Sequence, residues 1–582
     1  MVKKMDKVDV VTVGVGWTGG IIAAELTKAG YKVVGLEKGH DRTINDYLYD
    51  RNELKYSSRG EMMQDLNNNT ITYRNNLDQK AKPVRNKDSL VLGTSVGGGG
   101  SHWAAQTHRY FGYDFEIRNK MIEKYGEDKI PKGMILKDWG ITYDELEPYY
   151  DRMEKTMGVS GEEDPLAEER SDSYPTSPNK LPPSMKLFRE SAENLGYHPF
   201  VRPTGIASEQ YENPDGQTIE ACQYCAFCSN FGCDWGAKAD PIITVIPTAQ
   251  ETGNFELRTH SEVKRVLYEG DKATGVLYAD TRTGQEYEQP ADVVVLTSFV
   301  FNNVRLLLLS EIGEPYNPKN GKGIIGKHFT DHHFEPITRG FFDDKKFNNY
   351  IGSGGLGVCF TDYGADHFDH SDVNFLHGGQ IEIQIGGNGP ISNNPVPEGT
   401  PTWGEEFKKQ SLKYYNRYLD VSFKMATLPY EDHYMDLDPT YKDDAGDPLI
   451  RCTYDFTDDY HARSEFLQNK CYEVLEEMGA DIIEKHKLPD HFDGSFLFQH
   501  NGGGAVMGDS PENSAVNNYS QMWEMDNLFV CGASAFPHFG ITNPTLTVGA
   551  LTYRASEGII DYLDNEGGLL VSSNKEKQTN EV

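Results

Sequence analysis

The sequence lacks long hydrophobic runs, and no apolar stretch approaches the roughly 18 residues that a membrane-spanning helix requires. The nearest candidate, residues 293–301, is followed by two asparagines. The N-terminus carries Lys3 and Lys4 but has neither the apolar segment of a secretory signal nor a twin arginine. We therefore expect no membrane span and no export signal of the chain's own.

Positive charge is scarce as well. The 582 residues include 56 Lys and Arg against 89 Asp and Glu, which gives a net charge of −33. Such a balance argues against a nucleic-acid partner and against binding to anionic membrane surfaces. The acidic residues are spread along the chain, so we interpret them as a solvating surface.

Cysteine is the third scarcity, because the chain has only eight and four of them lie within one short segment. This is no disulfide framework, and it suggests a metal site. The spacing is C-x-x-C-x-x-C-x-x-x-x-C, formed by Cys222, Cys225, Cys228 and Cys233. Two consecutive x-x gaps are typical of iron–sulfur binding loops, whereas structural zinc more often takes two separated C-x-x-C pairs. The spacing favours an iron–sulfur cluster and leaves zinc open.

What the sequence does contain begins with a nucleotide-binding pattern. A β-branched run at residues 8–13 precedes glycines spaced G-x-G-x-x-G, namely Gly14, Gly16 and Gly19. In a βαβ unit the first glycine makes the turn, the second admits a pyrophosphate and the third lets the helix pack on the strand. Glu37, at the end of the next apolar run, is placed to hold ribose hydroxyls. We predict a dinucleotide site here.

A second glycine segment follows, with four consecutive glycines at Gly97, Gly98, Gly99 and Gly100. A loop without Cβ atoms allows close packing against a flat ring or a diphosphate. Ser101, His102 and Trp103 come directly after it. From the residues alone, His102 is most simply a capping or core histidine.

Near the C-terminus, two polar side chains stand in glycine-rich and small-residue surroundings. His500 precedes a glycine run, and Asn543 follows 43 residues later. A neutral imidazole beside a carboxamide can take a hydroxyl proton while the amide holds the oxygen, which suits alcohol oxidation. A satisfied core histidine is the simpler alternative for His500, and His538, five residues before Asn543, is the competing base.

Taken together, these segments resemble the glucose–methanol–choline flavin oxidoreductases. The resemblance rests on the glycine pattern at 14–19, the loop at 97–103, the His500 segment and the NPT sequence at 543–545. Within that family, SHW at 101–103 and the cysteine cluster resemble the large flavoprotein subunits of the gluconate 2-dehydrogenase group. The chain departs from the commonest family pattern, which has GGSS-x-x-N after the glycines.

The resemblance implies FAD as cofactor, with an imidazole at the position of His102 covalently joined to the flavin 8α-methyl. It adds further flavin-binding candidates, namely Val263 near the adenine, Gly532, Ala533, Pro544 and Thr545. Relatives with a similar cysteine cluster use three thiols for a three-iron cluster, so both 3Fe-4S and 4Fe-4S stay open. It also implies a small partner subunit and a cytochrome or quinone acceptor, which places the chain in the cytoplasm or at a membrane through that partner.

We therefore predict an α/β fold with a Rossmann-like, doubly wound FAD-binding domain. This domain comprises residues 1–335 and 490–571, with a cysteine insertion around 215–240. Residues 336–489 form a substrate domain of antiparallel sheet and helices, in which GGQIEIQIGG alternates like a half-buried strand. Residues 572–582 are predicted to be a disordered tail.

The predicted activity is oxidation of a secondary or hemiacetal alcohol of a sugar, a gluconate-like aldonate or a polyol. His500 takes the proton, the hydride goes to flavin N5, and electrons leave through the cysteine cluster. An anionic substrate needs a cation in the pocket of so acidic a protein, and Arg109 is the guess from the sequence. An oxygen-using oxidase and a lyase that keeps FAD without redox chemistry are the alternatives.

Overall fold

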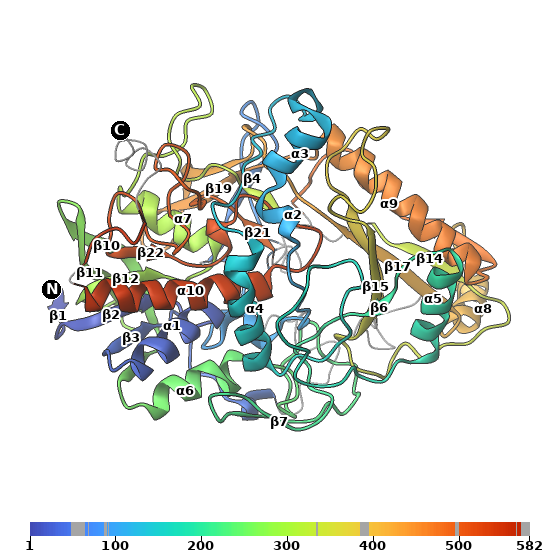
Figure 1. Ribbon diagram of the computed structural model, residues 1–582, viewed down its shortest axis with the longest axis horizontal. Coiled ribbons are helices and arrows are strands. Elements are labelled where there is room, and N and C mark those ends of the chain that lie inside the picture. Colours follow the sequence, from blue (N-terminus) through green and yellow to red (C-terminus); the bar gives the residue numbers. More distant parts are fainter. Residues whose placement is uncertain are drawn as a thin grey trace.

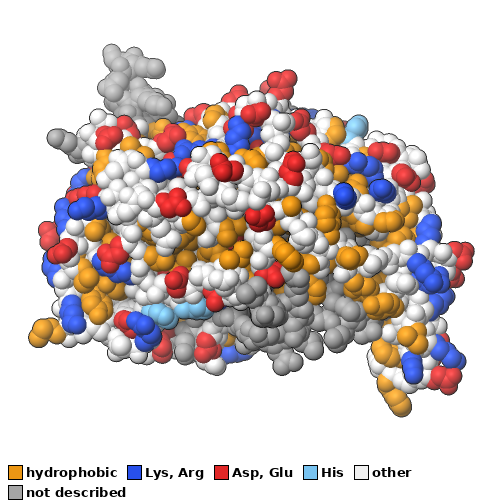
Figure 2. Space-filling model, turned by 90° about the horizontal axis from the view of Figure 1, so that it is seen from below, with side chains coloured by type: hydrophobic (Ala, Val, Ile, Leu, Met, Phe, Trp, Pro, Cys, Tyr) orange, Lys and Arg blue, Asp and Glu red, His pale blue; other side chains and the backbone are white. Residues whose placement is uncertain are grey.

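The structure is a computed structural model that describes residues 1–47, 64–67, 69–85, 90, 92–332, 336–384, 395–494, 500–565 and 567–571 (Figure 1). The predicted tail at 572–582 lies outside the described residues. None of the helices in this part of the chain is both long enough and apolar enough to cross a membrane. Acidic and basic side chains are interspersed over the face shown in Figure 2.

The first layer is a largely parallel sheet built from buried β-branched runs. Its parallel strands lie in the order β9 (Phe255–Arg258), β3 (Val33–Leu36), β2 (Val8–Val13), β12 (Glu286–Leu296) and β22 (Leu528–Val530). The first part of β12 also pairs with β1 (Lys3–Lys4) and with β11 (Lys272–Asp280), which continues to β10 (Ser261–Glu269). Strands whose side chains are buried on both faces explain the continuous apolar runs in the sequence.

Helices pack on this sheet as expected for the predicted fold class, which is confirmed. Helix α1 (Trp17–Lys28) contacts α6 (Val245–Glu251) and α10 (Thr545–Asp564), and α10 contacts α4 (Tyr143–Met157) (Figure 1, left half). Helix α7 (Val300–Leu309) contacts β10. Thr142 and Glu145 form a capping box at the start of α4.

The second layer is a six-stranded antiparallel sheet (Figure 1, right half). Its order is β20 (Ile482–Lys485), β14 (Thr338–Phe341), β17 (Tyr418–Met425), β16 (Gly379–Gln384), β15 (Gly357–Tyr363) and β6 (Phe200–Val201). Apolar side chains of one face pack under α5 (Pro183–Asn194) and α9 (Asp458–Glu477). The other face carries polar side chains, which are nevertheless buried.

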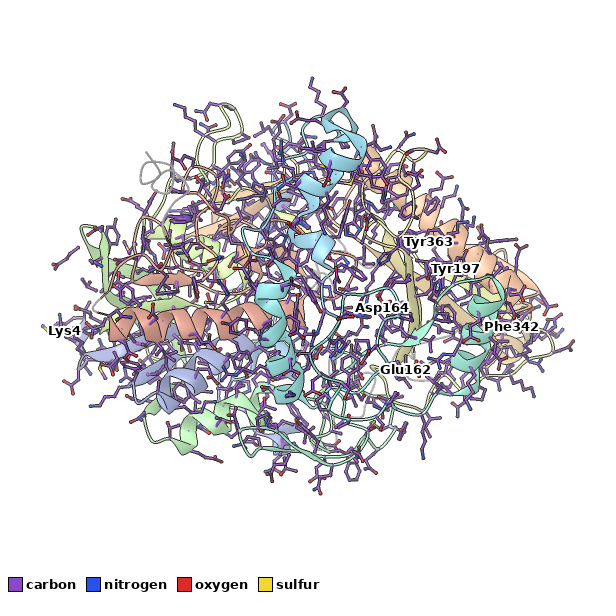
Figure 3. All side chains as sticks on the ribbon, viewed as in Figure 1. Lys4, Glu162, Asp164, Tyr197, Phe342 and Tyr363 are labelled. Carbon is purple, nitrogen blue, oxygen red and sulfur yellow. The ribbon has the colours of Figure 1, made fainter. Side chains whose placement is uncertain are left out.

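The two predicted domains exchange strands. Strand β6 and helix α5 lie within residues 1–335, yet β6 pairs with β15 and α5 packs on the second sheet. After α5, Tyr197 stacks on Phe360 with ring centroids 4.5 Å apart, and its hydroxyl meets that of Tyr363 at 2.8 Å (Figure 3). Strands β4 (Thr72–Arg74) and β5 (Lys82–Pro83) likewise join β18 (Tyr434–Lys442) and β19 (Pro448–Thr453).

Short elements complete the description. They are β7 (Tyr211–Glu212), β8 (Thr218–Ile219), β13 (Thr330–Asp331), β21 (Asn501–Gly502), α2 (Gly112–Phe115), α3 (Ile117–Tyr125) and α8 (Gly404–Tyr414). The pair formed by β13 and β21 matters most for function, because it places His332 beside His500.

Candidate active site

The first glycine pattern forms a tight turn between β2 and α1. Gly14 has φ 97°, a backbone conformation that favours glycine. A Cβ on Gly19 would lie 2.0 Å from the Gly14 carbonyl oxygen, so only glycine lets the helix approach the strand this closely. Gly16 precedes α1, whose first N–H groups receive no side-chain cap from it. The turn therefore offers unpaired helix N–H groups of the kind that bind a pyrophosphate.

Glu37 closes this turn from the next strand. Its carboxylate accepts the N–H of Val15 at 3.1 Å and the N–H of Gly39 at 2.8 Å. Burial raises the pKa of the carboxyl above its ordinary value, although these amide hydrogen bonds oppose the shift. Glu37 thus holds the turn in shape while lining the cavity beside it.

The second glycine loop packs directly on the first. The N–H of Gly97 donates to the Val15 carbonyl at 2.8 Å. A Cβ on Gly100 would lie 2.7 Å from Nε1 of Trp17, whereas one on Gly99 would meet no described atom within 4 Å. Gly99 faces the cavity, so the loop presents bare backbone to any ligand there.

His102 and Trp103 follow the loop into the same cavity. Burial lowers the pKa of His102 to about 3, with Lys238 and Arg42 adding to the shift, so the ring is neutral. Its Nδ1 is buried and has no hydrogen-bond partner among the described residues. Trp103 donates from Nε1 to the Ala239 carbonyl at 2.8 Å, which fixes the ring at the cavity wall.

One cavity collects most of the predicted site residues. The predicted residues that line it are Gly14, Gly16, Glu37, Gly98, Gly99, Gly100, His102, Trp103, Val263, His500, Gly532, Ala533, Pro544 and Thr545. Four others are not at its wall. Gly19 and Gly97 serve backbone packing, Ser101 is fully buried, and Asn543 lies behind the wall next to His500.

His500 and Asn543 come together although 43 residues separate them. Nε2 of His500 lies 3.5 Å from Nδ2 of Asn543, and its Nδ1 lies 3.3 Å from Nδ1 of His332. Lys424 donates to Oδ1 of Asn543 at 2.6 Å. Because an ammonium group only donates, this contact orients the carboxamide with its NH₂ group toward Nε2. Nε2 therefore carries the lone pair, and the ring proton lies on Nδ1.

Burial keeps this imidazole neutral. It lowers the pKa of His500 to about 3, and the nearby Lys424 adds to the shift. A neutral histidine whose Nε2 lone pair faces the Asn543 NH₂ group at 3.5 Å can accept a proton from a hydroxyl that comes between the two side chains. The pair is thus arranged as a proton acceptor beside a hydrogen-bond donor.

Sequence reasoning missed the charged residues behind this pair. Lys424 on β17 also donates to Gln106 and lies 3.4 Å from Glu382 on β16. Arg202 donates to the same carboxylate at 2.6 Å. Burial works to raise the pKa of Glu382, but Lys424 and Arg202 hold it at about 2. Burial lowers the pKa of Lys424 to about 8, so the lysine is still protonated at neutral pH.

Two other sequence candidates are occupied elsewhere. Arg109 binds Glu154 with two hydrogen bonds of 2.9 Å and Glu147 with one of 2.8 Å. Both carboxylates lie on α4, so Arg109 holds its own segment against that helix. His538, the competing base, accepts the indole N–H of Trp139 at 2.9 Å. Both side chains therefore have structural partners that account for their burial.

Among the described residues, the cysteine cluster does not form the metal centre that its spacing predicted. The four cysteines are close enough to influence one another's pKa, and burial raises that of Cys228 to about 12. Cys222 also accepts the N–H of Tyr224 at 3.4 Å. Across the part of the chain that the structure describes, no group of three His, Cys, Asp or Glu side chains is arranged to hold a metal ion. In this conformation the four thiols are neighbours but are not arranged as a ligand set.

The cavity itself fits FAD. Four features face one space. They are two glycine loops that carry no side chains, an open helix N-terminus, the acidic side chain of Glu37 directly after β3, and the buried His102 Nδ1, which has no partner among the described residues. These are the groups that a dinucleotide with a flat ring requires. When bound there, FAD would be held by the turn at residues 14–19, by Glu37 and by the loop at 97–103.

Comparison with known proteins agrees with this geometry. Residues 136–334 and 429–552 match the family models described as GMC oxidoreductase. The chain is similar to a gluconate 2-dehydrogenase flavoprotein of Pantoea cypripedii, with 39% identity covering 97% of this chain and 96% of that protein. It is 28% identical to a 2-methyl-1,2-propanediol dehydrogenase of Mycolicibacterium austroafricanum, covering 96% of each chain.

Solved structures show the same fold. A formate oxidase of Aspergillus oryzae superposes with a TM-score of 0.61 at 15% identity, covering 96% of this chain and 99% of that one. The flavoprotein relative, the matched family segments and the cavity lined by both glycine loops lead to one assignment. The chain belongs to the GMC oxidoreductases, a family of FAD-dependent enzymes.

Proposed function

We propose that this protein is a dehydrogenase that oxidises a secondary or hemiacetal hydroxyl of a sugar, an aldonate or a polyol. The observation that carries the proposal is the contact of His500 Nε2 with Asn543 Nδ2 at 3.5 Å, beside a cavity suited to FAD. The name of the Pantoea relative, a gluconate 2-dehydrogenase flavoprotein, supports a sugar-acid or related substrate.

The chemistry follows from the orientation of these two side chains. When bound, FAD supplies the hydride acceptor at its N5 position. His500 takes the hydroxyl proton at Nε2, because loss of hydride from a neutral alcohol would otherwise build positive charge on carbon. Asn543 donates a hydrogen bond from Nδ2 to the same oxygen, while Lys424 holds its Oδ1. Burial excludes water and keeps His500 neutral before the substrate arrives.

Flavin reduction by a deuterated substrate under anaerobic conditions tests this proposal. His500→Ala should slow the reduction by about 10²-fold or more, because general-base catalysis contributes roughly 10²–10⁴. Asn543→Ala should cost less, since it removes one orienting hydrogen bond. His538→Ala is the matched control, since His538 is an equally buried histidine held by Trp139. Reduction at the wild-type rate in His500→Ala would sink the assignment.

The same proposal includes a covalent link between His102 and the flavin. His102 would supply a ring nitrogen that bonds to the 8α carbon in place of one methyl hydrogen; that hydrogen and the imidazole N–H would leave as two protons, and an external oxidant would take up the two electrons. The buried, unpartnered Nδ1 of His102 at the cavity supports this role. Acid-precipitated, fully loaded protein should remain yellow, and a white pellet would contradict the link.

An iron–sulfur relay at Cys222, Cys225, Cys228 and Cys233 is a separate part of the proposal, and no step above depends on it. Four thiols close together support it, whereas the arrangement of the thiols in the structure does not. Iron with matching acid-labile sulfide in purified protein is the expected result. Zinc without sulfide, or no metal at all, would overturn the relay.

The name of the Pantoea relative, a dehydrogenase flavoprotein, supports the proposal that this chain works with a partner. We propose a small partner subunit and a cytochrome or quinone as the electron acceptor. Co-expression with such a subunit should move activity from the cytosolic to the membrane fraction, and an unchanged distribution would argue against it.

A further inference from the structure

The polar face of the second sheet is buried, which is costly unless its charged groups serve a purpose. Register pairs Gln380 with Lys424 and Cys359 with Glu382, so these side chains share one face of β15, β16 and β17. Glu382 is 1% exposed, Lys424 5% and Arg202 0%. The opposite face, with residues such as Ile381 and Phe423, packs under α5 and α9.

These charges do not cancel. Arg202 and Lys424 contribute two positive charges, and Glu382 contributes the single negative charge that contacts them. His108, which is also near them, is neutral because burial lowers its pKa well below the usual value. The cluster therefore carries a net charge of +1 inside a protein whose total is −33.

Several polar atoms of this cluster have no partner among the described side chains. Nε of Arg202, which only donates, and Nε2 of His108 are buried without a hydrogen bond; Oε1 of Gln380 is unpaired as well, but it is an acceptor and does not itself call for an anion. Buried polar groups in native proteins are normally paired, so unpaired atoms beside an excess charge point to a missing polar ligand. The positive charge indicates that this ligand is an anion.

The position of Lys424 connects the cluster to the reaction. Its ammonium group lies on the far side of the Asn543 carboxamide from His500, at 2.6 Å from Oδ1. It also donates to the neutral oxygen of Gln106 and lies 3.4 Å from the carboxylate of Glu382. A carboxylate makes a stronger hydrogen bond to an ammonium than an amide oxygen does.

We propose that Lys424, with Arg202 and Glu382 behind it, forms the site that recognises the carboxylate of a 2-hydroxy acid. The carboxylate takes the place of the Gln106 oxygen on Lys424, and the hydroxyl on the adjacent carbon lies between His500 and Asn543. This inference rests on the proposed function and narrows its substrate class to sugar acids. Lys424 is thus a specificity-determining residue, and it also positions Asn543.

Kinetics with gluconate and its neutral analogue gluconamide separate these two roles. Lys424→Met removes the charge but keeps a similar length, so any loss from a misplaced Asn543 affects both substrates alike. The ratio of their kcat/KM values cancels that common loss. The wild type should prefer gluconate by roughly 10²-fold, since hydrogen bonds to charged groups are worth about 1.5–3 kcal/mol. In Lys424→Met the ratio of the kcat/KM value for gluconate to that for gluconamide should fall to about one.

A second variant tests the contribution of the carboxylate beside Lys424. Glu382→Gln keeps the size of the side chain but removes the carboxylate that opposes the lowering of the Lys424 pKa, so as the pH is raised the preference for gluconate should be lost at a lower pH than in the wild type. Lys408→Met, which changes an exposed lysine on α8, is the matched control and should leave the ratio unchanged. A ratio that stays at the wild-type value in Lys424→Met would overturn the inference.

Binding without turnover keeps the inference separate from the proposed function. The probe is 2-deoxygluconate, which has the carboxylate but lacks the hydroxyl to be oxidised. Titration into flavin-loaded protein, followed by the flavin absorption spectrum, should give a Kd about 10²-fold weaker in Lys424→Met than in the wild type. If neither gluconate, gluconamide nor glucitol reduces the wild-type flavin, the proposed function fails. Equal 2-deoxygluconate affinities of the two proteins would refute carboxylate recognition.

Discussion

Three glycines near the cavity should respond differently to the same substitution, because the space around each differs. In Gly19→Ala the new Cβ would lie 2.0 Å from the Gly14 carbonyl oxygen, which forces α1 away from the turn. In Gly16→Ala the nearest atom, the Gly97 carbonyl oxygen, would be 3.5 Å away, which is ordinary contact. In Gly99→Ala no described atom would lie within 4 Å. Only the first change therefore strains the protein itself.

The size of the effect can be worked out. Overpacking typically costs about 1–3 kcal/mol, and so severe an overlap with backbone belongs at the upper end, near about 3 kcal/mol. With an unfolding entropy of about 2.1 cal/mol/K per residue, a 582-residue chain that unfolds as one unit loses roughly 2–3 °C in Tm for that cost. Gly16→Ala and Gly99→Ala should leave the Tm of the flavin-free protein within about 1 °C of wild type.

Flavin binding should show the reverse order of sensitivity. Gly16 and Gly99 line the cavity, so an added methyl group occupies space that the cofactor needs. We expect both variants to fold and to retain little FAD, as measured by the ratio of flavin to protein absorbance after gel filtration. Two results would refute the reasoning: an unchanged Tm of flavin-free Gly19→Ala, or full flavin loading of Gly99→Ala.

Two further predictions concern buried groups outside the cavity. Burial lowers the pKa of His538 to about 4, so between pH 6.5 and 4 the unfolded chain takes up a proton that the folded protein refuses, and stability falls as the pH falls. Between pH 7 and 4.5 the free energy of unfolding, measured in urea, should fall by about 2–3 kcal/mol more in the wild type than in His538→Gln. Equal decreases in the two proteins would contradict the assignment. Arg109→Met leaves Glu147 without its arginine and Glu154 with Arg170 alone, so it should lower the free energy of unfolding by about 2–4 kcal/mol while flavin reduction by gluconate keeps its wild-type rate. A slower reduction in Arg109→Met at full flavin loading would return Arg109 to the substrate site.

The nucleotide-binding half of the site could be predicted because its residues act through local spacing. The positions of Gly14, Gly16 and Gly19 between a strand and a helix dictate one turn, and Glu37 ends the strand that follows it. Contacts of this kind depend on few residues and short separations, so the sequence contains almost all of the information.

Spacing alone was a poor guide for the cysteines and for the strand exchange. The C-x-x-C pattern states which thiols are near in sequence, but ligand geometry also depends on how the loop between Cys222 and Cys233 is folded. Likewise, nothing local in β6 shows that it will pair with β15, because its partner lies more than 150 residues further along the chain. Such pairings are decided by the whole fold.

The charged cluster behind the catalytic pair shows why the remaining part of the site escaped prediction. The alternation in residues 379–384 correctly predicted a strand, and it separated Gln380 and Glu382 from Ile381 and Ile383. Alternation reports which residues share a face, but it does not report what covers that face. The alternation was interpreted as a half-buried strand, whereas here its polar face is also buried and is covered by Lys424 on β17 and by Arg202, which directly follows β6. A cation with its charge partly uncompensated becomes visible only when the three elements are assembled, and that is why Lys424 could be found in the structure while the sequence offered only Arg109.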